Sequence, residues 1–258
     1  MAKTDVKELL DAGVHFGHLT RKWNPNMAPY IYMERNGIHI INLYKTAAKL
    51  EESVNAIKKI VLSGRKILFV ATKKQAKDIV AEKADSVNMP YITERWPCGM
   101  LTNFVTIRKA VKKMNAIDRM KADGTFETLS KKEKLQVDRQ RAKLEKNLGS
   151  ISDMTRLPGA IFVVDTLNEK ISVQEAQKLN IPIFAMVDTN SDPNEVDFII
   201  PSNDDASKSI EKILDIVCSA IKESLEERKK EKEIDEQKKL EEAEAQSIAD
   251  DTDASEEE

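Results

Sequence analysis

The sequence predicts an α/β fold: a doubly wound, five-stranded parallel sheet of flavodoxin-like or Rossmann-like type, with an inserted α-helical hairpin and an acidic C-terminal tail. Near-continuous runs of Val, Ile and Phe alternate with helical segments, which is typical of parallel strands buried on both faces. Right-handed crossovers between such strands produce the doubly wound arrangement. Between residues 103 and 148, two long charged helical patterns interrupt this alternation and predict the hairpin.

Each element around the sheet follows from a short apolar run or a periodic segment. The five strands are predicted at residues 66–72, 90–93, 160–165, 182–188 and 198–201. Helices are predicted at residues 46–62, 74–86 and 172–179, and from about 206 onward. Asp204 or Asp205 is the predicted cap of the last helix, because aspartate favours the position before a first helical turn.

The N-terminal segment precedes the sheet and carries its own signals. Residues 4–12 predict a short helix with an apolar stripe. Asn36-Gly37 separates two β-branched and aromatic runs, which predicts a β-hairpin over residues 30–43. Between them, residues 13–25 mix glycine, histidine, aromatic and basic side chains with little periodicity, and they predict a loop.

The inserted hairpin is predicted from two helical patterns, at about 103–121 and 130–148, joined by a turn that contains Asp123-Gly124. Each apolar stripe is narrow and the other faces are charged, so the pair buries one seam rather than a globular face. About 20 residues per arm at ~1.5 Å each give an arm of roughly 30 Å. We therefore expect an antiparallel hairpin that projects from the body.

Charge is distributed unevenly along the 258 residues, although the net charge is only −3. Residues 223–258 hold 16 acidic and 6 basic residues, whereas residues 1–222 hold 28 acidic and 35 basic ones. A basic body favours a polyanionic partner, and ordinary surface charge is the alternative. We divide the chain into a body, residues 1–222, which includes the hairpin at 103–148, and a charged, largely disordered extension, residues 223–258.

Cysteine usage and hydropathy bear on the compartment. Cys98 and Cys218 lie far apart in unlike contexts, so they predict neither a disulfide framework nor a zinc ligand set. No apolar run approaches the length that spans a membrane, and residues 1–5 lack the apolar region of a signal peptide. We therefore expect a soluble, cytoplasmic protein without a membrane partner.

A doubly wound sheet also favours a nucleotide-dependent enzyme, which binds phosphate at a glycine-rich turn after the first strand. Here that turn is residues 71–75, Ala-Thr-Lys-Lys-Gln, and no glycine occurs between Gly64 and Gly99. The chain has three histidines and no serine on a nucleophile elbow, which does not support a catalytic triad. The enzyme hypothesis therefore rests on the fold alone, and no small-molecule substrate or cofactor is predicted.

Lysine and arginine are interleaved with aromatic residues in three places, a pattern of phosphate contact combined with base stacking in RNA recognition. The candidate RNA-binding residues are Arg21, Lys22, Trp23, Lys73, Lys74, Arg95, Trp96, Arg108, Lys109, Lys112 and Lys113. The alternatives are a loop at 21–23 that packs on the core and a solvated helix start at 73–74. Together the three places favour RNA binding over catalysis.

Five aspartates near predicted strand ends form a further candidate site. They are Asp188, Asp192, Asp197, Asp204 and Asp205. Carboxylates can bind a metal together with a histidine, here His15 or His18, provided that the fold brings them together. Caps and turns are the alternative explanation for most of these aspartates.

Several longer motifs stand out along the chain. They are Gly13-Val14-His15-Phe16-Gly17-His18 with Arg21 and Trp23-Asn24-Pro25, His39-Ile40-Ile41-Asn42-Leu43, Phe69-Val70-Ala71-Thr72-Lys73, Arg95-Trp96 with Gly99-Met100-Leu101-Thr102-Asn103, Leu157-Pro158, and Val187-Asp188-Thr189-Asn190-Ser191-Asp192-Pro193. In this order, over roughly residues 5–222, they resemble the bacterial small-subunit ribosomal protein S2 family. The acidic extension is not part of the family pattern.

The resemblance implies a structural protein of the small ribosomal subunit, located on cytoplasmic ribosomes and without enzymatic activity. It implies binding to small-subunit ribosomal RNA, with the hairpin as a main anchor. It also implies contact with neighbouring ribosomal proteins and help in recruiting the large multi-domain messenger-binding protein of that subunit. Some family members hold a metal near the positions of His18, Asp188 and Asp205, so these three residues are the metal-ligand candidates.

Overall fold

The computed structural model describes residues 5–253 and confirms the predicted α/β fold. Its main sheet has five parallel strands in the order β5-β4-β6-β7-β8. The strands are β4 (Ile67–Val70), β5 (Tyr91–Ile92), β6 (Ala160–Val164), β7 (Ile183–Val187) and β8 (Phe198–Pro201). All five fall within the predicted ranges. Counted along the chain, their spatial order is 2-1-3-4-5, which is the flavodoxin-like one.

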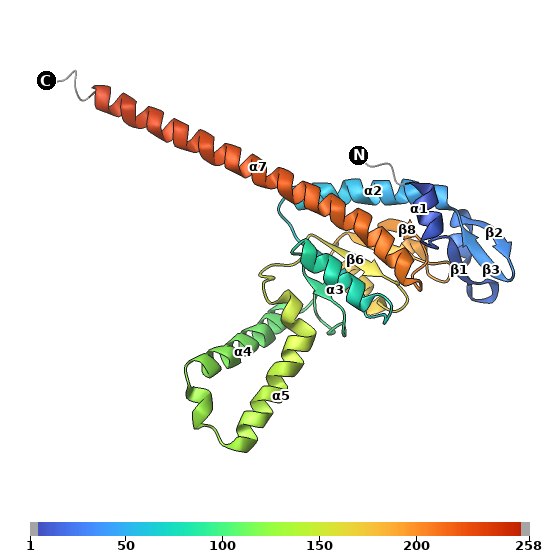
Figure 1. Cartoon of the computed structure of the whole chain (residues 1–258), viewed down its shortest axis with the longest axis horizontal. Helices are drawn as coiled ribbons and strands as arrows, with labels where there is room; N and C mark the ends of the chain where they lie inside the picture. Colours follow the sequence, from blue (N-terminus) through green and yellow to red (C-terminus); the bar gives the residue numbers. More distant parts are fainter. Residues whose placement is uncertain (1–4, 254–258) are drawn as a thin grey trace.

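Helices cover both faces of this sheet, which is why its strands are apolar throughout (Figure 1). One face packs against α1 (Val6–Asp11), α2 (Leu43–Leu62), α3 (Lys77–Ser86) and the first part of α7 (Ser207–Asp253). The other face packs against α6 (Lys170–Lys178) and the base of the inserted hairpin. Successive side chains of β4 alternate between the two layers: Ile67 and Phe69 face the first, Leu68 and Val70 the second.

One helix start differs from the predictions because an asparagine side chain caps it, and a second asparagine shapes the turn before α7. Helix α2 begins earlier than residue 46, since the side chain of Asn42 accepts two backbone hydrogen bonds from the first turn. Before α7, Asn203 Oδ1 accepts hydrogen bonds from the backbone N–H groups of Asp205, at 2.9 Å, and Ala206, at 3.2 Å. Asn203 thus holds the turn that leads into α7, which begins at Ser207, near the predicted start. Neither the Asp204 nor the Asp205 carboxylate accepts a hydrogen bond from the backbone of the described part of α7, so both remain available at the sheet edge.

A second sheet of three antiparallel strands precedes α2. Its strands are β1 (Phe16–Leu19), β2 (Ile31–Arg35) and β3 (Ile38–Ile41), in the order β1-β3-β2. The predicted β-hairpin is confirmed, and both of its turn residues have positive φ, 53° at Asn36 and 74° at Gly37. Strand β1 lies inside the segment that was predicted to be a loop. The prediction missed this strand because its glycine and histidine interrupt the apolar alternation that is typical of a strand.

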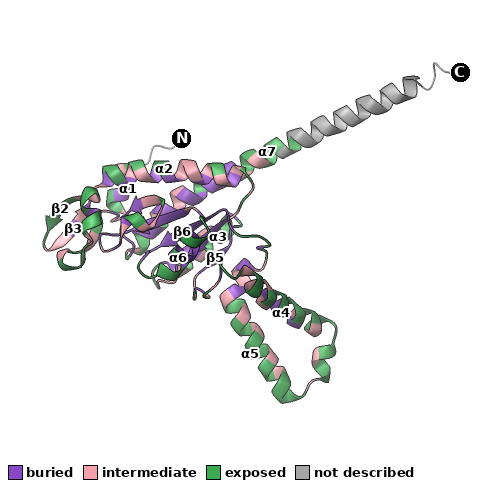
Figure 2. Cartoon of the chain, turned by 180° about the vertical axis from the view of Figure 1, so that it is seen from behind, coloured by how far each residue is buried: buried purple, intermediate pink, exposed green. Residues whose placement is uncertain are grey.

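The helical hairpin is confirmed, and it projects from the body (Figure 1). Its arms are α4 (Phe104–Ala122) and α5 (Lys131–Leu148). The seam on α4 buries Val111, Met114 and Ile117, while most other positions on both arms are exposed or half-buried (Figure 2). Helix α5 starts with a capping box between Ser130 and Glu133.

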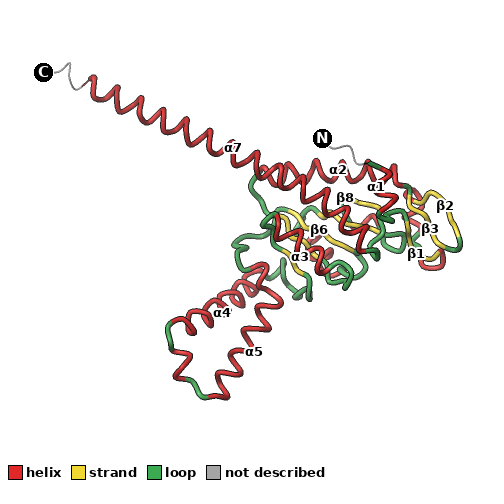
Figure 3. The backbone as a smooth tube through the Cα atoms, viewed as in Figure 1, coloured by secondary structure: helices red, strands yellow, loops and turns green. Residues whose placement is uncertain are grey.

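Helix α7 continues far beyond the body, as Figure 3 shows. Near the point of departure, Lys58 Nζ on α2 lies 2.7 Å from Glu223 Oε2. The extension after residue 222, expected to be largely disordered, is thus helical as far as Asp253, and residues 254–258 lie outside the described part. Its Glu, Lys, Gln and Ala residues favour helix even without a core. Among the described residues, no helix is both long and apolar enough to cross a membrane.

Candidate nucleic-acid interface and metal centre

The positive charge of the body is concentrated in the hairpin. Residues 103–148 hold 13 Lys and Arg against 6 Asp and Glu, a net charge of +7. The rest of residues 1–222 holds 22 basic and 22 acidic residues and is neutral overall. The hairpin is therefore the part of the body that attracts a polyanion electrostatically.

Most acidic side chains of the hairpin already have partners within it. The pairs are Asp118 and Glu145 with Arg141, Asp138 with Lys121, Glu127 with Lys134, and Glu133 with Ser130 in the capping box. These contacts stabilise the arms and pair only a few of the basic residues. The net positive charge of the hairpin therefore comes from its remaining lysines and arginines.

Lys109, Lys112 and Lys113 form a basic face on α4. Their spacing of three and four residues places them on one side of the helix, opposite the seam that contains Val111 and Met114. All three are exposed, and none forms a salt bridge with another described residue. Adjacent ammonium groups without carboxylate partners can neutralise successive phosphates of a nucleic acid.

The loop after β1 has the exposure that its predicted RNA contact requires. Arg21 and Lys22 are exposed in a short 3-10 helix, Thr20–Lys22. Trp23 is 39% exposed, and its ring centroid lies 5.1 Å from that of His39. Trp23 therefore combines the two interpretations of this loop, since part of the ring packs against the small sheet and part is open.

The structure contradicts the predicted base stacking by Trp96, and it shows that Arg108 has a hydrogen-bond partner within the protein. Trp96 is only 7% exposed, and its Nε1–H donates to Glu175 Oε1 at 3.1 Å, so the ring belongs to the core and is not free to stack on a base. The neighbouring Arg95 is exposed. Arg108 Nη1 donates to the backbone oxygen of Met154 at 3.0 Å, which ties α4 to the segment after the hairpin.

Lys73 lies at the carboxyl edge of the main sheet, among carboxylates. Its Nζ lies 2.6 Å from Asp205 Oδ1, 2.8 Å from Asp204 Oδ1 and 3.4 Å from Asp165 Oδ2. Burial lowers the pKa of the Lys73 ammonium, but the hydrogen bonds to Asp204 and Asp205 outweigh it and raise that pKa well above its ordinary value. Contrary to the prediction, Lys73 is therefore engaged internally, whereas the adjacent Lys74 is exposed.

Doubly wound folds bind nucleotides at this same edge, but here the edge is acidic. The backbone N–H of Thr72, at the first strand-to-helix turn, donates to Glu169 Oε1 at 2.8 Å. A phosphate at this turn would therefore meet a carboxylate instead of free N–H groups. Electrostatic repulsion adds to the missing glycines as a reason against nucleotide binding.

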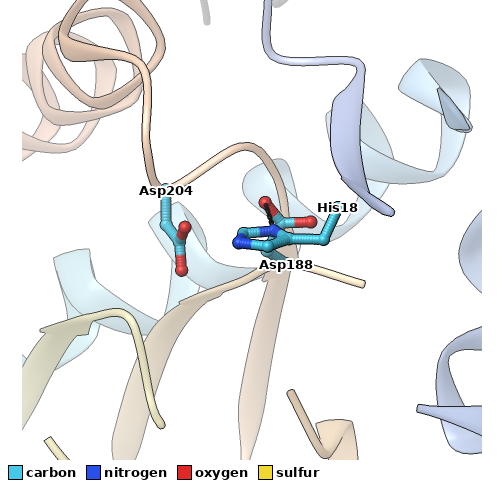
Figure 4. Close-up of side chains that lie close together, drawn as sticks. All are labelled: His18, Asp188 and Asp204. Atoms are coloured by element: carbon cyan, nitrogen blue, oxygen red, sulfur yellow. Dashed lines mark ion pairs between the residues drawn. The ribbon is translucent and has the colours of Figure 1, made fainter. Parts of the chain in front are cut away.

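His18 reaches the carboxyl edge from β1 (Figure 4). Its Nδ1 lies 2.9 Å from Asp188 Oδ2, and its Nε2 lies 3.2 Å from Asp205 Oδ2. The hydrogen bond to Asp188 raises the pKa of His18 above its ordinary value, although burial opposes this. The close approach depends on Gly17, because a Cβ there would lie 2.6 Å from Thr189 Cγ2.

Asp204 completes the cluster, and one of its oxygens has no partner. Asp204 is fully buried, and burial together with the Asp165 and Asp188 carboxylates raises its pKa to about 7. Its Oδ2 accepts no hydrogen bond from any described residue. His18, Asp188 and Asp204 each offer a ligand atom within 4.8 Å of the others (Figure 4). One imidazole nitrogen and two carboxylate oxygens suit a divalent cation such as Zn²⁺.

The three predicted metal-ligand candidates, His18, Asp188 and Asp205, thus lie in one cluster. Asp205 pairs with both His18 and Lys73 and is half exposed, whereas Asp204 points its unpartnered oxygen inward. The sequence pattern could not distinguish these adjacent aspartates, because their roles depend on which one turns toward β1. The other two strand-end aspartates accept backbone hydrogen bonds elsewhere.

An apolar groove of about 630 Å³ lies between α1, the small sheet and the start of α2. Its exposed apolar side chains are Leu10, Phe16, Tyr32, Met33 and Tyr44, of which the two tyrosines are 70% and 77% exposed. The sequence did not reveal this groove, because three separate elements line it and single exposed apolar residues are ordinary.

Comparison with known proteins gives matches over most of the chain. A sequence model of the family described as ribosomal protein S2 matches residues 9–224. The small ribosomal subunit protein uS2 of Flavobacterium johnsoniae is 75% identical over 244 residues, which cover 95% of this chain and 96% of that protein. The proteins of the same name from Christiangramia forsetii and Phocaeicola vulgatus are 78% and 68% identical, over 89% and 90% of this chain and 77% and 83% of their own lengths. The family match includes every strand of both sheets and the whole hairpin.

Proposed function

The chain belongs to the ribosomal protein S2 family, and on this premise we propose that it binds small-subunit ribosomal RNA through its helical hairpin. Membership gives it a structural role in the small ribosomal subunit rather than an enzymatic one. Association with the ribosome places it in the bacterial cytoplasm, and its neighbours there are ribosomal RNA and other ribosomal proteins.

The distribution of charge is the observation that supports RNA binding. The hairpin carries a net +7, the rest of the body is neutral, and three adjacent lysines of α4 have no carboxylate partner among the described residues. Such contacts supply affinity and orientation with little sequence discrimination. Arg21, Lys22 and Trp23 offer a second contact, where two phosphates and one stacked base can bind together.

Affinity for small-subunit ribosomal RNA should fall steeply with salt. Each neutralised phosphate adds about −0.7 to −0.9 to the slope of log affinity against log salt, so about five contacts give a slope near −4. We expect a loss of roughly 200-fold between about 50 and 200 mM salt, measured by co-sedimentation or filter binding of the full chain. A flat salt profile would contradict RNA binding through phosphates.

We also propose that the apolar groove receives an apolar segment of the large messenger-binding protein of the small subunit. A cluster of exposed tyrosine, phenylalanine and methionine has the composition of an interface centre and of a binding groove. The small sheet that lines the groove lies at the opposite end of the body from the hairpin (Figure 1). The protein partner and the RNA can therefore be bound at the same time.

A charge placed in this groove should weaken the protein partner selectively. Met33 is 47% exposed, so Met33→Glu preserves the fold while its carboxylate loses water on binding. We expect at least about a tenfold weaker affinity for the purified messenger-binding protein, by calorimetry, and unchanged affinity for RNA. Leu167→Glu is the matched control, because Leu167 is 52% exposed and does not line the groove. Equal effects of the two variants would exclude the groove as the binding site.

The cluster of His18, Asp188 and Asp204 supports a third proposal, a structural divalent cation. The unpartnered buried oxygen of Asp204 and the mixed nitrogen and oxygen donors fit such an ion. The ion would neutralise two aspartates and hold β1 against the main sheet. Lys73 already offers one positive charge to Asp204, so lysine and ion stabilise the same carboxylate.

A further inference from the structure

The loop that leads from the main sheet into the hairpin is organised by one carboxylate, that of Glu175 on α6. Glu175 is 7% exposed. Its two oxygens accept five hydrogen bonds, all from residues 96–102: from Gly99 N at 2.7 Å, Leu101 N at 2.9 Å, Trp96 Nε1 at 3.1 Å, and Thr102 N and Oγ1 at 3.2 Å each. Three backbone N–H groups and two side-chain donors of one loop thus converge on a single carboxylate.

The loop donors keep this buried carboxylate charged. Burial alone would raise the pKa of Glu175, but the N–H donors of Trp96, Leu101, Gly99 and Thr102 outweigh it and lower that pKa. Because the pKa is lowered on folding, the stabilisation is present above the ordinary value of 4.5 and is lost as the pH falls through the lower pKa of the folded protein. No basic side chain forms a salt bridge with Glu175 among the described residues, so the loop itself supplies the compensating dipoles.

The position of Glu175 connects the sheet to the first arm of the hairpin. Val173 and Ala176, beside it on α6, are buried against the main sheet. On the loop side, α4 begins at Phe104, directly after the residues that Glu175 holds. The other links at the root of the hairpin are more exposed, such as Lys146 to Glu94 at 3.1 Å. The least exposed charged link between the sheet layer and the hairpin is therefore this carboxylate.

We propose that Glu175 is a positioning residue, which fixes the direction of the hairpin relative to the sheet and thereby sets the affinity for ribosomal RNA. This inference rests on the proposed RNA binding through the hairpin. Lysines on a fixed arm lose little conformational entropy on binding. If the base of the hairpin were flexible, binding would have to order it, and this entropy loss would weaken the affinity. Glu175 itself does not contact RNA, because the loop encloses it.

Glu175→Gln tests the proposal, because it keeps the size of the side chain and removes its charge. An amide accepts through one oxygen only and turns an NH₂ group toward the loop donors. We expect exchange of the Gly99, Leu101 and Thr102 amide hydrogens to become at least about tenfold faster, because charge-assisted hydrogen bonds are lost. Affinity of the full chain for small-subunit ribosomal RNA should fall about tenfold, with an unchanged salt slope, because the phosphate contacts themselves remain.

Glu169→Gln is the matched control. Glu169 precedes α6, is 3% exposed and serves Thr72 at the carboxyl edge instead of the hairpin root. It should leave both loop exchange and RNA affinity as in the wild type. A folded Glu175→Gln protein with wild-type affinity would overturn the inference. If lysine variants of α4 also keep wild-type affinity, the proposed RNA binding fails instead.

Trp96→Phe covers the case in which Glu175→Gln does not fold. It removes one hydrogen bond to Glu175 and keeps an aromatic ring in the core. We expect faster exchange of the same loop amides and weaker RNA affinity, and both changes should be smaller than those of Glu175→Gln. Faster exchange of the loop amides with unaltered RNA affinity would show that the loop holds itself and not the hairpin direction, and would overturn the inference.

Discussion

Replacing Lys109, Lys112 and Lys113 together with glutamate is expected to weaken binding to small-subunit ribosomal RNA by about 100-fold at roughly 0.1 M salt, because three phosphate contacts become repulsions. The slope of log affinity against log salt should become shallower by about 3. The same variant should be poorly incorporated into small subunits, measured by sedimentation. These three residues are exposed and outside the apolar seam, so the thermal unfolding of the variant should resemble that of the wild type.

The matched control for this variant changes the net charge by the same amount elsewhere. Lys7, Lys59 and Lys208 lie on α1, α2 and α7 and are exposed. Their joint replacement by glutamate should alter RNA affinity only slightly, because their ammonium groups lie on helices that cover the sheet rather than on the hairpin. Equal losses in the two triple variants would mean that total charge, and not the hairpin, attracts the RNA. Normal incorporation of the hairpin variant would exclude the hairpin as a main anchor.

Lys73→Met is expected to lower the free energy of unfolding by about 3–5 kcal/mol at neutral pH. This is the usual effect of removing one partner from a buried ion pair. Lys73 is 16% exposed, and its loss leaves Asp204 buried among Asp165 and Asp188 without a cation. The control is Lys83→Met, because Lys83 pairs with the half-exposed Asp215 at the surface. This replacement should lower the free energy of unfolding by less than about 1 kcal/mol. Chemical denaturation of the wild type and the two variants measures the difference.

The same variant tests the proposed cation. If His18, Asp188 and Asp204 bind a divalent ion, Zn²⁺ or Mn²⁺ in excess should restore much of the stability that Lys73→Met loses, because the ion replaces the missing positive charge. The restoration should disappear when His18→Ala is added, since one ligand is then missing. Stabilisation by metal that is equal with and without His18 would refute the site. A Lys73→Met protein as stable as the Lys83→Met control would show that the cluster does not depend on Lys73.

Local patterns in the chain were sufficient for the main sheet, the hairpin and the Asn36-Gly37 turn. A strand buried on both faces must be apolar at every position, and a projecting pair of helices needs only a narrow seam, so both leave a signal within a few residues. The concentration of basic residues between 103 and 148 is likewise a property of the sequence alone. These features depend on neighbours along the chain.

The roles of Lys73, Trp96 and Asp204 depend on residues far away in the chain. Lys73 and its neighbour Lys74 are the same residue type in sequence. Only the packing of β4 beside the segments that follow β6 and β8 places the Lys73 ammonium among carboxylates. Trp96 is removed from the surface by Glu175, 79 positions later. Local hydrogen bonding and burial periodicity determine the elements, whereas long-range packing determines which charged groups are buried, because desolvation and Coulomb energy depend on distance in space and not on separation along the chain.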